Sequence, residues 1–541
     1  MMRLIVLLML ACSIAGMAAA EVPEPTSGWV AASSPAPKQS RPRTAFEQSR
    51  KILFQMSLVR TGITAAGVII LVWGFLPSAR SARRPRRLRI LLLLLLAVAA
   101  YSSYYQFFKF SHVRGFATSD NFHYYLGSKY FSELGYFGLY ECSLYSLTER
   151  GRPPLTGPNP QARNLRTMQV EPAAAVTLSG EDCPARFGRE RWQLFGDDVI
   201  YFASQWPKHI RNATWLDHGY HPPPSWTLVG GTVAQYIQVN DSLSAYLLAR
   251  LDRVLIALTL IGIGWAFGLE TACVVAILWG TGALWRYTLV GDAFLRHLWW
   301  AAGIAGVIGL RRGFNASAGS ALMLSALFRI FPSTLGIGYL THAIREAVRN
   351  GRPLSKHYVF AAGAGTSLLL VVFLSTWASG QGLSVYQDFV LKIREFASTP
   401  ISNDIGLGVV ADWFFPTSNL LAGMFRAFVT LSFVVLFWRA LAGTEDWEAA
   451  SAGALLIPIL VSPAAYYLSL FVIVALMAAR RPRIGVIVLV TALLWNVNNL
   501  LLFQEYAEFD WASAISVVSC FAVVLELARP VEEQAQRSAR A

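Results

Sequence analysis

Long uninterrupted apolar runs constrain this chain more than any other feature. Residues 90–100 read ILLLLLLAVAA, and comparable runs recur as far as residue 528. Only 14% of the residues are charged and 55% are hydrophobic, whereas soluble globular proteins carry about 25% charged residues. A helix needs about 20 apolar residues to cross a bilayer, and several runs approach or reach that length. The sequence therefore predicts an all-α fold, a polytopic bundle of transmembrane helices.

Basic residues gather between the apolar runs and predict the orientation of the chain. The net charge is +14, and the clusters lie at 78–89, 311–312, 345–356, 480–483 and from 529 onward. Clusters of this kind mark the cytoplasmic loops of membrane proteins, so we expect no nucleic-acid partner. The polar residues from about 109 to 222 then form one large external loop, and the lipid bilayer is the first expected partner.

The order of apolar and polar segments predicts four parts. Residues 1–20 are expected to be a signal peptide or a first transmembrane helix. Residues 21–87 form an N-terminal extension with one transmembrane helix and a basic cytoplasmic loop. Residues 88–530 form the main transmembrane domain, and residues 531–541 form a cytoplasmic tail.

The external loop is too long to be a simple connection. Residues 121–133 and 192–210 have helical character, and the many aromatic residues of 121–133 predict a helix lying along the membrane interface. Residues 386–397 suggest another amphipathic interfacial helix. Cys142 and Cys183 both lie in the large loop and could form a disulfide if that loop faces an oxidising compartment.

Several later apolar segments are too short to cross a bilayer by themselves. Residues 318–329 and 331–344 form one such pair, and Pro332 between them predicts a short hairpin. Helices that do not reach across leave a cavity, and broken helices at membrane depth must line protein or water.

Asp120 is the first candidate for catalysis, because it follows an outward apolar run and precedes a helix. A carboxylate in a partly dry pocket can act as a general base toward a hydroxyl group. The alternative is that Asp120 only caps the helix that follows. His123, three residues further on, lies near the same helix face and could pair with the acid or with a phosphate; Lys129 lies on a following turn.

A second group of polar residues, Asp217, His218 and His221, directly precedes an apolar segment that begins with three prolines. This position at the membrane surface suits contact with a substrate phosphate or hydroxyl. The alternative is a simple polar boundary, with Trp226 as an interfacial anchor.

In combination these motifs resemble the GT-C superfamily of integral membrane glycosyltransferases, and the segment VSPAAYYLSL is similar to the branch that uses polyprenyl-phosphate mannose. The first external loop of such proteins carries an acid and a small-residue-rich helix, and the next core helix follows an acid and a Pro-Pro pair. The matching residues are Asp120, Tyr124, Gly127, Gly135, Asp217, His221, Pro222, Pro223, Arg250, Arg253, Asp292 and Arg329.

The resemblance implies a polyprenyl-phosphate sugar as donor, with Asp120 as the catalytic base and Arg329 holding the lipid phosphate. The alternative for Arg329 is a charge at a hairpin tip that reaches the interface. Tyr124 belongs to the same motif and is counted with the substrate-binding candidates. Asp292 and Arg296 are expected either to pair internally or to contact the acceptor or phosphate.

No cofactor is indicated by a strong motif. A divalent cation is possible, and Asp197 and Asp198 are weak candidates for a metal site because they are adjacent acids in the external loop.

The resemblance thus implies a glycosyltransferase that inverts the configuration of a transferred hexose or pentose. The expected acceptor is a glycan, lipid or protein hydroxyl. The arginine- and alanine-rich composition suggests the inner membrane of a bacterium, with the active site facing the periplasm. The alternative function is a polytopic lipid or glycan transporter or flippase, and a third is a lipid-dependent ligase or phosphotransferase.

Overall fold

The computed structural model describes residues 41–76, 83–108, 117–152, 155, 159–206, 212–239, 241–397, 403–502 and 507–530. The expected signal peptide or first helix at 1–20 and the expected tail at 531–541 lie outside the described residues. The described residues are 79% helical, which confirms the all-α class.

Six of the described helices are long and apolar enough to cross a membrane. They are α2 (Arg41–Trp73), α4 (Arg83–Tyr104), α20 (Ser355–Ser379), α23 (Asn419–Ala440), α27 (Pro482–Leu501) and α28 (Ala507–Leu527). A seventh span results if Leu269–Thr281 and Ala283–Val290, which are bent by 62°, are counted as one broken helix. These lengths and compositions support the predicted helical membrane bundle.

The other described helices of the bundle differ widely in length. They are α14 (Ser242–Phe267), α15 (Leu269–Thr281), η4 (Ala283–Trp285), α16 (Tyr287–Val290), α17 (Leu298–Arg312), α18 (Asn315–Phe328), α19 (Ser333–Asn350), η5 (Leu441–Gly443), α24 (Asp446–Ala452), η6 (Gly453–Leu456), α25 (Ile457–Leu460), η7 (Ala465–Leu470), α26 (Phe471–Ala475) and η8 (Leu476–Ala479). The predicted bend at Pro332 lies between α18 and α19, but α18 packs mainly against α17 and α20 and not back against α19.

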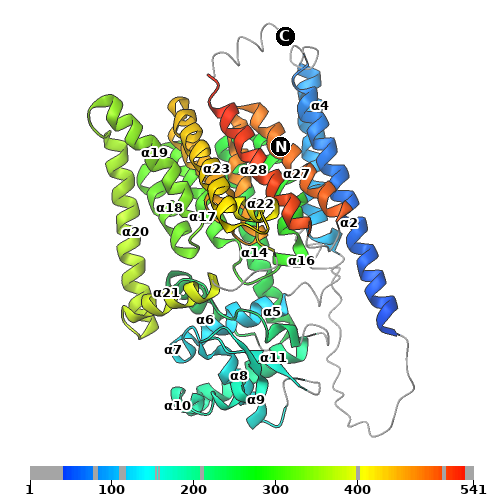
Figure 1. Ribbon diagram of the computed structural model, residues 1–541, viewed down its shortest axis with the longest axis vertical. Helices are drawn as coiled ribbons and strands as arrows, with labels where there is room; N and C mark the ends of the chain where they lie inside the picture. Colours follow the sequence, from blue (N-terminus) through cyan, green and yellow to red (C-terminus); the bar gives the residue numbers. More distant parts are fainter. Residues whose placement is uncertain are drawn as a thin grey trace.

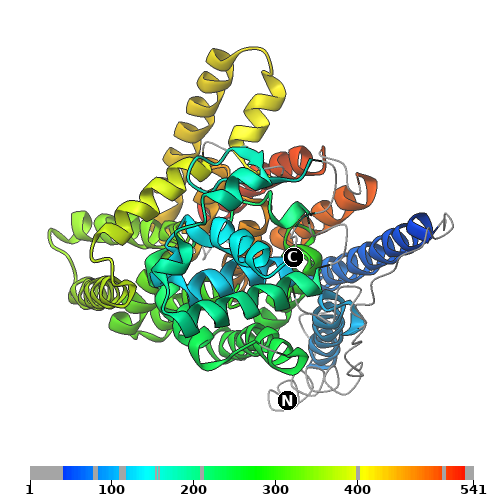
Figure 2. The same cartoon turned by 90° about the horizontal axis from the view of Figure 1, so that it is seen from below.

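A separate layer of short elements covers one end of the bundle (Figure 1). It contains η1 (Gln106–Phe108), α5 (Thr118–Asn121), η3 (Phe122–Leu126), α6 (Gly127–Lys129), α7 (Phe131–Leu134), α8 (Gly138–Glu149), β1 (Gln161–Arg163), β2 (Val170–Pro172), α9 (Ala173–Leu178), α10 (Cys183–Arg186) and α11 (Arg189–Gln205). Figure 2 looks onto this layer from below. The chain then re-enters the bundle through α13 (Pro224–Tyr236), and the amphipathic helix α21 (Ser384–Ala397) lies between layer and bundle.

The layer departs from the sequence prediction in two respects. Residues 121–133 were expected to form one interfacial helix, but the structure divides them among α5, η3, α6 and α7. The element η3 is a single π-helical turn, and such turns are frequent at functional sites. The small antiparallel pair β1–β2 was not predicted either.

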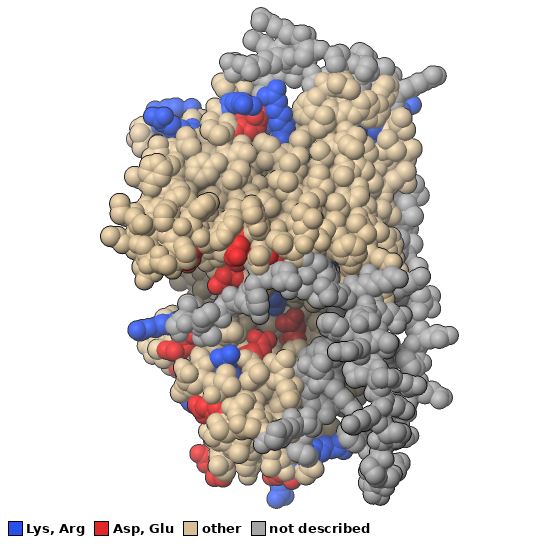
Figure 3. Space-filling view, turned by 45° about the vertical axis from the view of Figure 1, so that its right-hand side comes forward, with Lys and Arg blue, Asp and Glu red and all other residues tan. Residues whose placement is uncertain are grey.

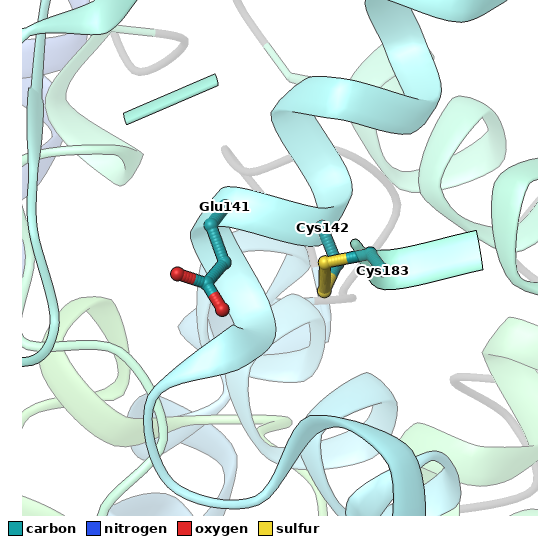
Figure 4. Close-up of side chains that lie close together, drawn as sticks. All are labelled: Glu141, Cys142 and Cys183. Carbon is teal, nitrogen blue, oxygen red and sulfur yellow. A yellow bond between two sulfur atoms is a disulfide. The ribbon is translucent and has the colours of Figure 1, made fainter. Parts of the chain in front are cut away.

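Aromatic packing and a disulfide hold the layer together. Phe122 is fully buried and packs edge-on against Trp206 and Trp215. Cys142 and Cys183 are joined by a disulfide with a Cα–Cα distance of 5.5 Å (Figure 4). A disulfide within a folded domain typically stabilises the folded state by about 2–4 kcal/mol. Glu141 lies beside it and pairs with Arg186 at 2.8 Å.

The distribution of charge on the surface agrees with a membrane bundle. On the face shown in Figure 3, mainly basic side chains lie at the end opposite the layer, a broad belt without charged side chains follows, and both charges appear from the lower edge of the bundle onto the layer. This belt is consistent with the small share of charged residues in the sequence, 14%. Which membrane surrounds it, and which end faces the cytoplasm, stay predictions.

Candidate functional site

Asp120 lies at the junction between the layer and the bundle. Its carboxylate is 3.8 Å from Nη1 of Arg296, and its side chain is 29% exposed. The N-cap of α5 is Ala117, not Asp120, and no side chain caps that helix. The alternative interpretation of Asp120 as a helix cap is therefore wrong, and its carboxylate lies beside Arg296 instead.

Tyr124, one turn further along, lies between two arginines. The centre of its ring is 5.4 Å from the guanidinium carbon of Arg296 and 5.2 Å from that of Arg329. Its hydroxyl forms a hydrogen bond of 3.1 Å with Nε2 of His221. On the other side, the ring of Tyr466 lies 4.4 Å from the guanidinium of Arg296. The aromatic faces position both cations by cation–π attraction.

The two arginines carry more positive charge than their surroundings neutralise. Arg296 is 9% exposed and Arg329 is 5% exposed. Within the described ranges, Asp120 is the one carboxylate within 4.0 Å of Arg296, and Arg329 has none. Burying a charge without a partner is costly, so the pair is well suited to hold an anion. A guanidinium contacts the oxygens of a phosphate in a bidentate manner.

Burial raises the pKa of Asp120, although the neighbouring Arg296 opposes the shift. The nearby charge of Asp217 raises it further. A carboxylate with a raised pKa is a stronger proton acceptor than an ordinary one. This is the property that a general base requires.

His123, Asp217 and His218 form a second cluster next to Asp120. Nδ1 of the buried His123 is 3.6 Å from the carboxylate of Asp217, and its Nε2 contacts the hydroxyl of Tyr140 at 2.7 Å. Burial lowers the pKa of His123. Burial would raise the pKa of Asp217, but hydrogen bonds from His218 and the charge of His123 hold it below its ordinary value.

His221 connects Tyr124 with α21. Burial and the charge of Arg329 lower its pKa well below the ordinary value. Its Nδ1 lies 3.1 Å from the carbonyl oxygen of Gly219. When Nδ1 donates to that carbonyl, Nε2 is left to accept the hydroxyl proton of Tyr124. The ring of Phe396 from α21 stacks on His221 at 5.0 Å.

Lys129 and Asp198 are engaged with each other and do not join the group around Asp120. The ammonium of Lys129 is 2.7 Å from the carboxylate of Asp198, which also accepts a hydrogen bond of 2.8 Å from Tyr130. Asp197 pairs with Arg150 at 2.5 Å. Asp197 and Asp198, the weak candidates for a metal site, therefore already have basic partners. A metal ion would have to displace those partners.

Asp292 is likewise satisfied internally. Its carboxylate accepts hydrogen bonds from Arg253 and from the hydroxyl of Tyr287 at 2.6 Å. Arg250 lies 3.9 Å away. This is the internal pairing that the sequence left open as one alternative for Asp292. Arg296, four residues later, lies 3.8 Å from the carboxylate of Asp120, and its contact with an acceptor or phosphate stays a prediction.

The sequence analysis missed three residues that complete the site. Tyr466 and Tyr467 lie in η7, and Phe396 lies in α21. The tyrosines belong to the segment VSPAAYYLSL, which was noticed only as a family resemblance. Nothing in the sequence marked Phe396 as a site residue, because aromatic residues are common on the apolar face of amphipathic helices.

A cavity of about 190 Å³ lies beside the site, between α6, α13 and the end of α20. Ser128, Lys129, Pro224 and Ser375 are among the residues that line it. Asp120 does not line this cavity.

No family model, curated protein or solved structure matches this chain. The GT-C resemblance therefore stays a prediction made from the motifs. The function has to be argued from the site itself.

Proposed function

We propose that this chain is a membrane glycosyltransferase of the GT-C type, which moves a sugar from a polyprenyl-phosphate donor to an acceptor hydroxyl. The observation that carries the proposal is the pair of buried arginines, Arg296 and Arg329, beside the partly exposed carboxylate of Asp120. An anion site next to a general base is the arrangement that transfer from a phosphate leaving group needs.

In the proposed reaction, the acceptor hydroxyl gives its proton to Asp120. The hydroxyl oxygen attacks the anomeric carbon of the sugar from the face opposite the phosphate. The bond between that carbon and the phosphate oxygen breaks, and the electron pair leaves with the phosphate. Arg329 and Arg296 stabilise the charge that develops there. Attack from the opposite face inverts the anomeric configuration.

The proposed location is the inner membrane of a bacterium, with Asp120 on the periplasmic side. The disulfide between Cys142 and Cys183 supports an oxidising compartment for the layer, because such bonds persist mainly outside the cytosol. The donor is held by a lipid tail, and the charge-free belt of the bundle would face that tail (Figure 3).

A transporter or flippase is the second candidate. The bent pair of helices from α15 to α16 could form one broken span, and transporters commonly contain broken transmembrane helices. Their binding sites lie near the membrane midplane. The site described above lies at the junction with the layer, and this position favours the enzyme. Transfer of labelled sugar to an acceptor separates the two candidates.

The proposal is tested by changing Arg329 to glutamine. Removing one donor to a developing anion lowers the catalytic rate about 100- to 1,000-fold, so we expect a loss of that size. The measurement is transfer of labelled sugar from a polyprenyl-phosphate donor by the purified full-length protein. Arg349→Gln is the matched control, because Arg349 is exposed at the far end of α19. Equal activity of both variants would remove Arg329 from the phosphate site.

The pH dependence follows from the raised pKa of Asp120. Below that pKa the carboxyl is protonated and cannot accept a proton. Transfer should therefore fall as the pH drops, starting at a higher pH than for an ordinary aspartate with a pKa of about 3.9. Arg296 lowers the pKa of Asp120, so Arg296→Gln should move the acid limb of the rate profile to still higher pH. If the acid limb of the Arg296→Gln profile stays at the wild-type pH, a group other than Asp120 determines that limb.

A further inference from the structure

A second cavity lies at the end of the bundle opposite the layer. Its volume is about 750 Å³, which is within the range of small-molecule sites. It is enclosed by the last turns of α2, the start of α4, the junction of α14 with α15, and the start of α27. Helix α4 runs toward the layer, so its first residues lie at the opposite end of the bundle (Figure 1).

Three arginines and one glutamate line this cavity: Arg86, Arg89, Arg483 and Glu270. Glu270 is paired with Arg89 at 2.8 Å. Arg86 is exposed and makes no ion pair within the described part of the chain. The cavity lining therefore has two more positive than negative charges.

The charge of Arg483 is also available to a ligand. It lies 3.8 Å from Glu526, but Glu526 has a closer partner in Arg529 at 2.5 Å. Its side chain is 40% exposed, so its guanidinium can still reach an anion. Arg86 and Arg483 thus carry positive charge that no carboxylate in the lining matches.

The remaining walls are apolar. Leu71 comes from α2, Phe75 from the turn that follows α2, Ile90 from α4, and Val274 from α15. Gly74 lets the guanidinium of Arg89 pack against the backbone, because a Cβ there would lie only 2.0 Å from Nη1 of Arg89. The cavity thus combines basic side chains with an apolar wall, and it lies between helices that are long enough to cross a membrane.

We infer that this cavity binds a phospholipid with an anionic headgroup. The headgroup phosphate would contact Arg86 and Arg483, and an acyl chain would lie along the apolar wall. Basic pockets between transmembrane helices recognise such headgroups by the same combination of charge and apolar surface. The site is separate from Asp120, and the inference does not depend on the proposed transferase activity.

The test is native mass spectrometry of the full-length protein, titrated in detergent with phosphatidylglycerol or with phosphatidylcholine. The wild type should retain phosphatidylglycerol preferentially. The double variant Arg86→Gln/Arg483→Gln should bind it about 10- to 30-fold more weakly, as expected for the loss of two basic contacts. The control Arg349→Gln/Arg352→Gln removes the same charge from exposed positions at the same end and should leave retention unchanged.

A second variant tests the apolar wall without changing the charge. Ala479 lines the cavity and is exposed, so Ala479→Phe should fill the space for the acyl chain and lower lipid retention. Equal retention by wild type and both cavity variants would overturn the inference. Full competition by millimolar inorganic phosphate would also overturn it, because the site would then take free phosphate and not a lipid.

Discussion

Replacing Asp120 by asparagine should lower the rate of sugar transfer about 100- to 10,000-fold, the range for loss of a general base. Asparagine has nearly the same shape, but it cannot take up the proton of the acceptor hydroxyl. Arg296 and Arg329 remain in place in this variant, so binding of the donor phosphate should persist. The measurement is transfer from labelled polyprenyl-phosphate mannose or arabinose, together with binding of the polyprenyl phosphate alone.

Asp197→Asn is the matched control for this experiment. Asp197 is also an acid of the layer, but its side chain is 69% exposed and pairs with Arg150. We expect activity close to that of the wild type. An Asp120→Asn protein that transfers sugar at the wild-type rate would exclude Asp120 as the base, and loss of donor binding as well would indicate a structural role.

The second large effect concerns the stability of the bundle. Asp292→Asn leaves Arg253 as a buried charge without its carboxylate partner, and Arg253 is only 1% exposed. Breaking a buried pair by removing one partner costs about 3–5 kcal/mol. The purified variant should unfold at a clearly lower temperature than the wild type in the same detergent and at the same scan rate.

The matched control for stability is Asp412→Asn. Asp412 pairs with Arg426 at 2.5 Å, but their side chains are 64% and 44% exposed. Pairs at such positions contribute about 0–1 kcal/mol, so this variant should unfold close to the wild-type temperature. Similar unfolding temperatures for Asp292→Asn and the wild type would show that Arg253 has another source of neutralisation.

The transmembrane helices could be predicted because their signal is local. The run that became α4 and the segment that became α20 are apolar over a full bilayer crossing. The bend at Pro332 was also predictable, since proline cannot continue a helix without loss of a hydrogen bond. The division of residues 121–133 into four pieces was not, because the π-helical turn η3 depends on tertiary packing of its five buried residues.

The site was predictable only in part for a similar reason. Asp120, Tyr124 and His221 belong to motifs that can be read along the chain. Arg296 and Tyr466 lie in turns and short helices far along the sequence, and only the fold brings their side chains together. Lys129 and Asp292 show the reverse case, because their residue types suit a substrate site but the fold gives both of them internal partners.

The central claim is that Arg296 and Arg329 hold the phosphate of a lipid-linked sugar beside Asp120. The most direct test is an experimental structure of the full-length protein in a lipid nanodisc with bound polyprenyl phosphate. We expect phosphate density within hydrogen-bond distance of both guanidinium groups, on the side that faces the carboxylate of Asp120. Phosphate density at any other place in the bundle, with these two arginines left empty, would contradict it.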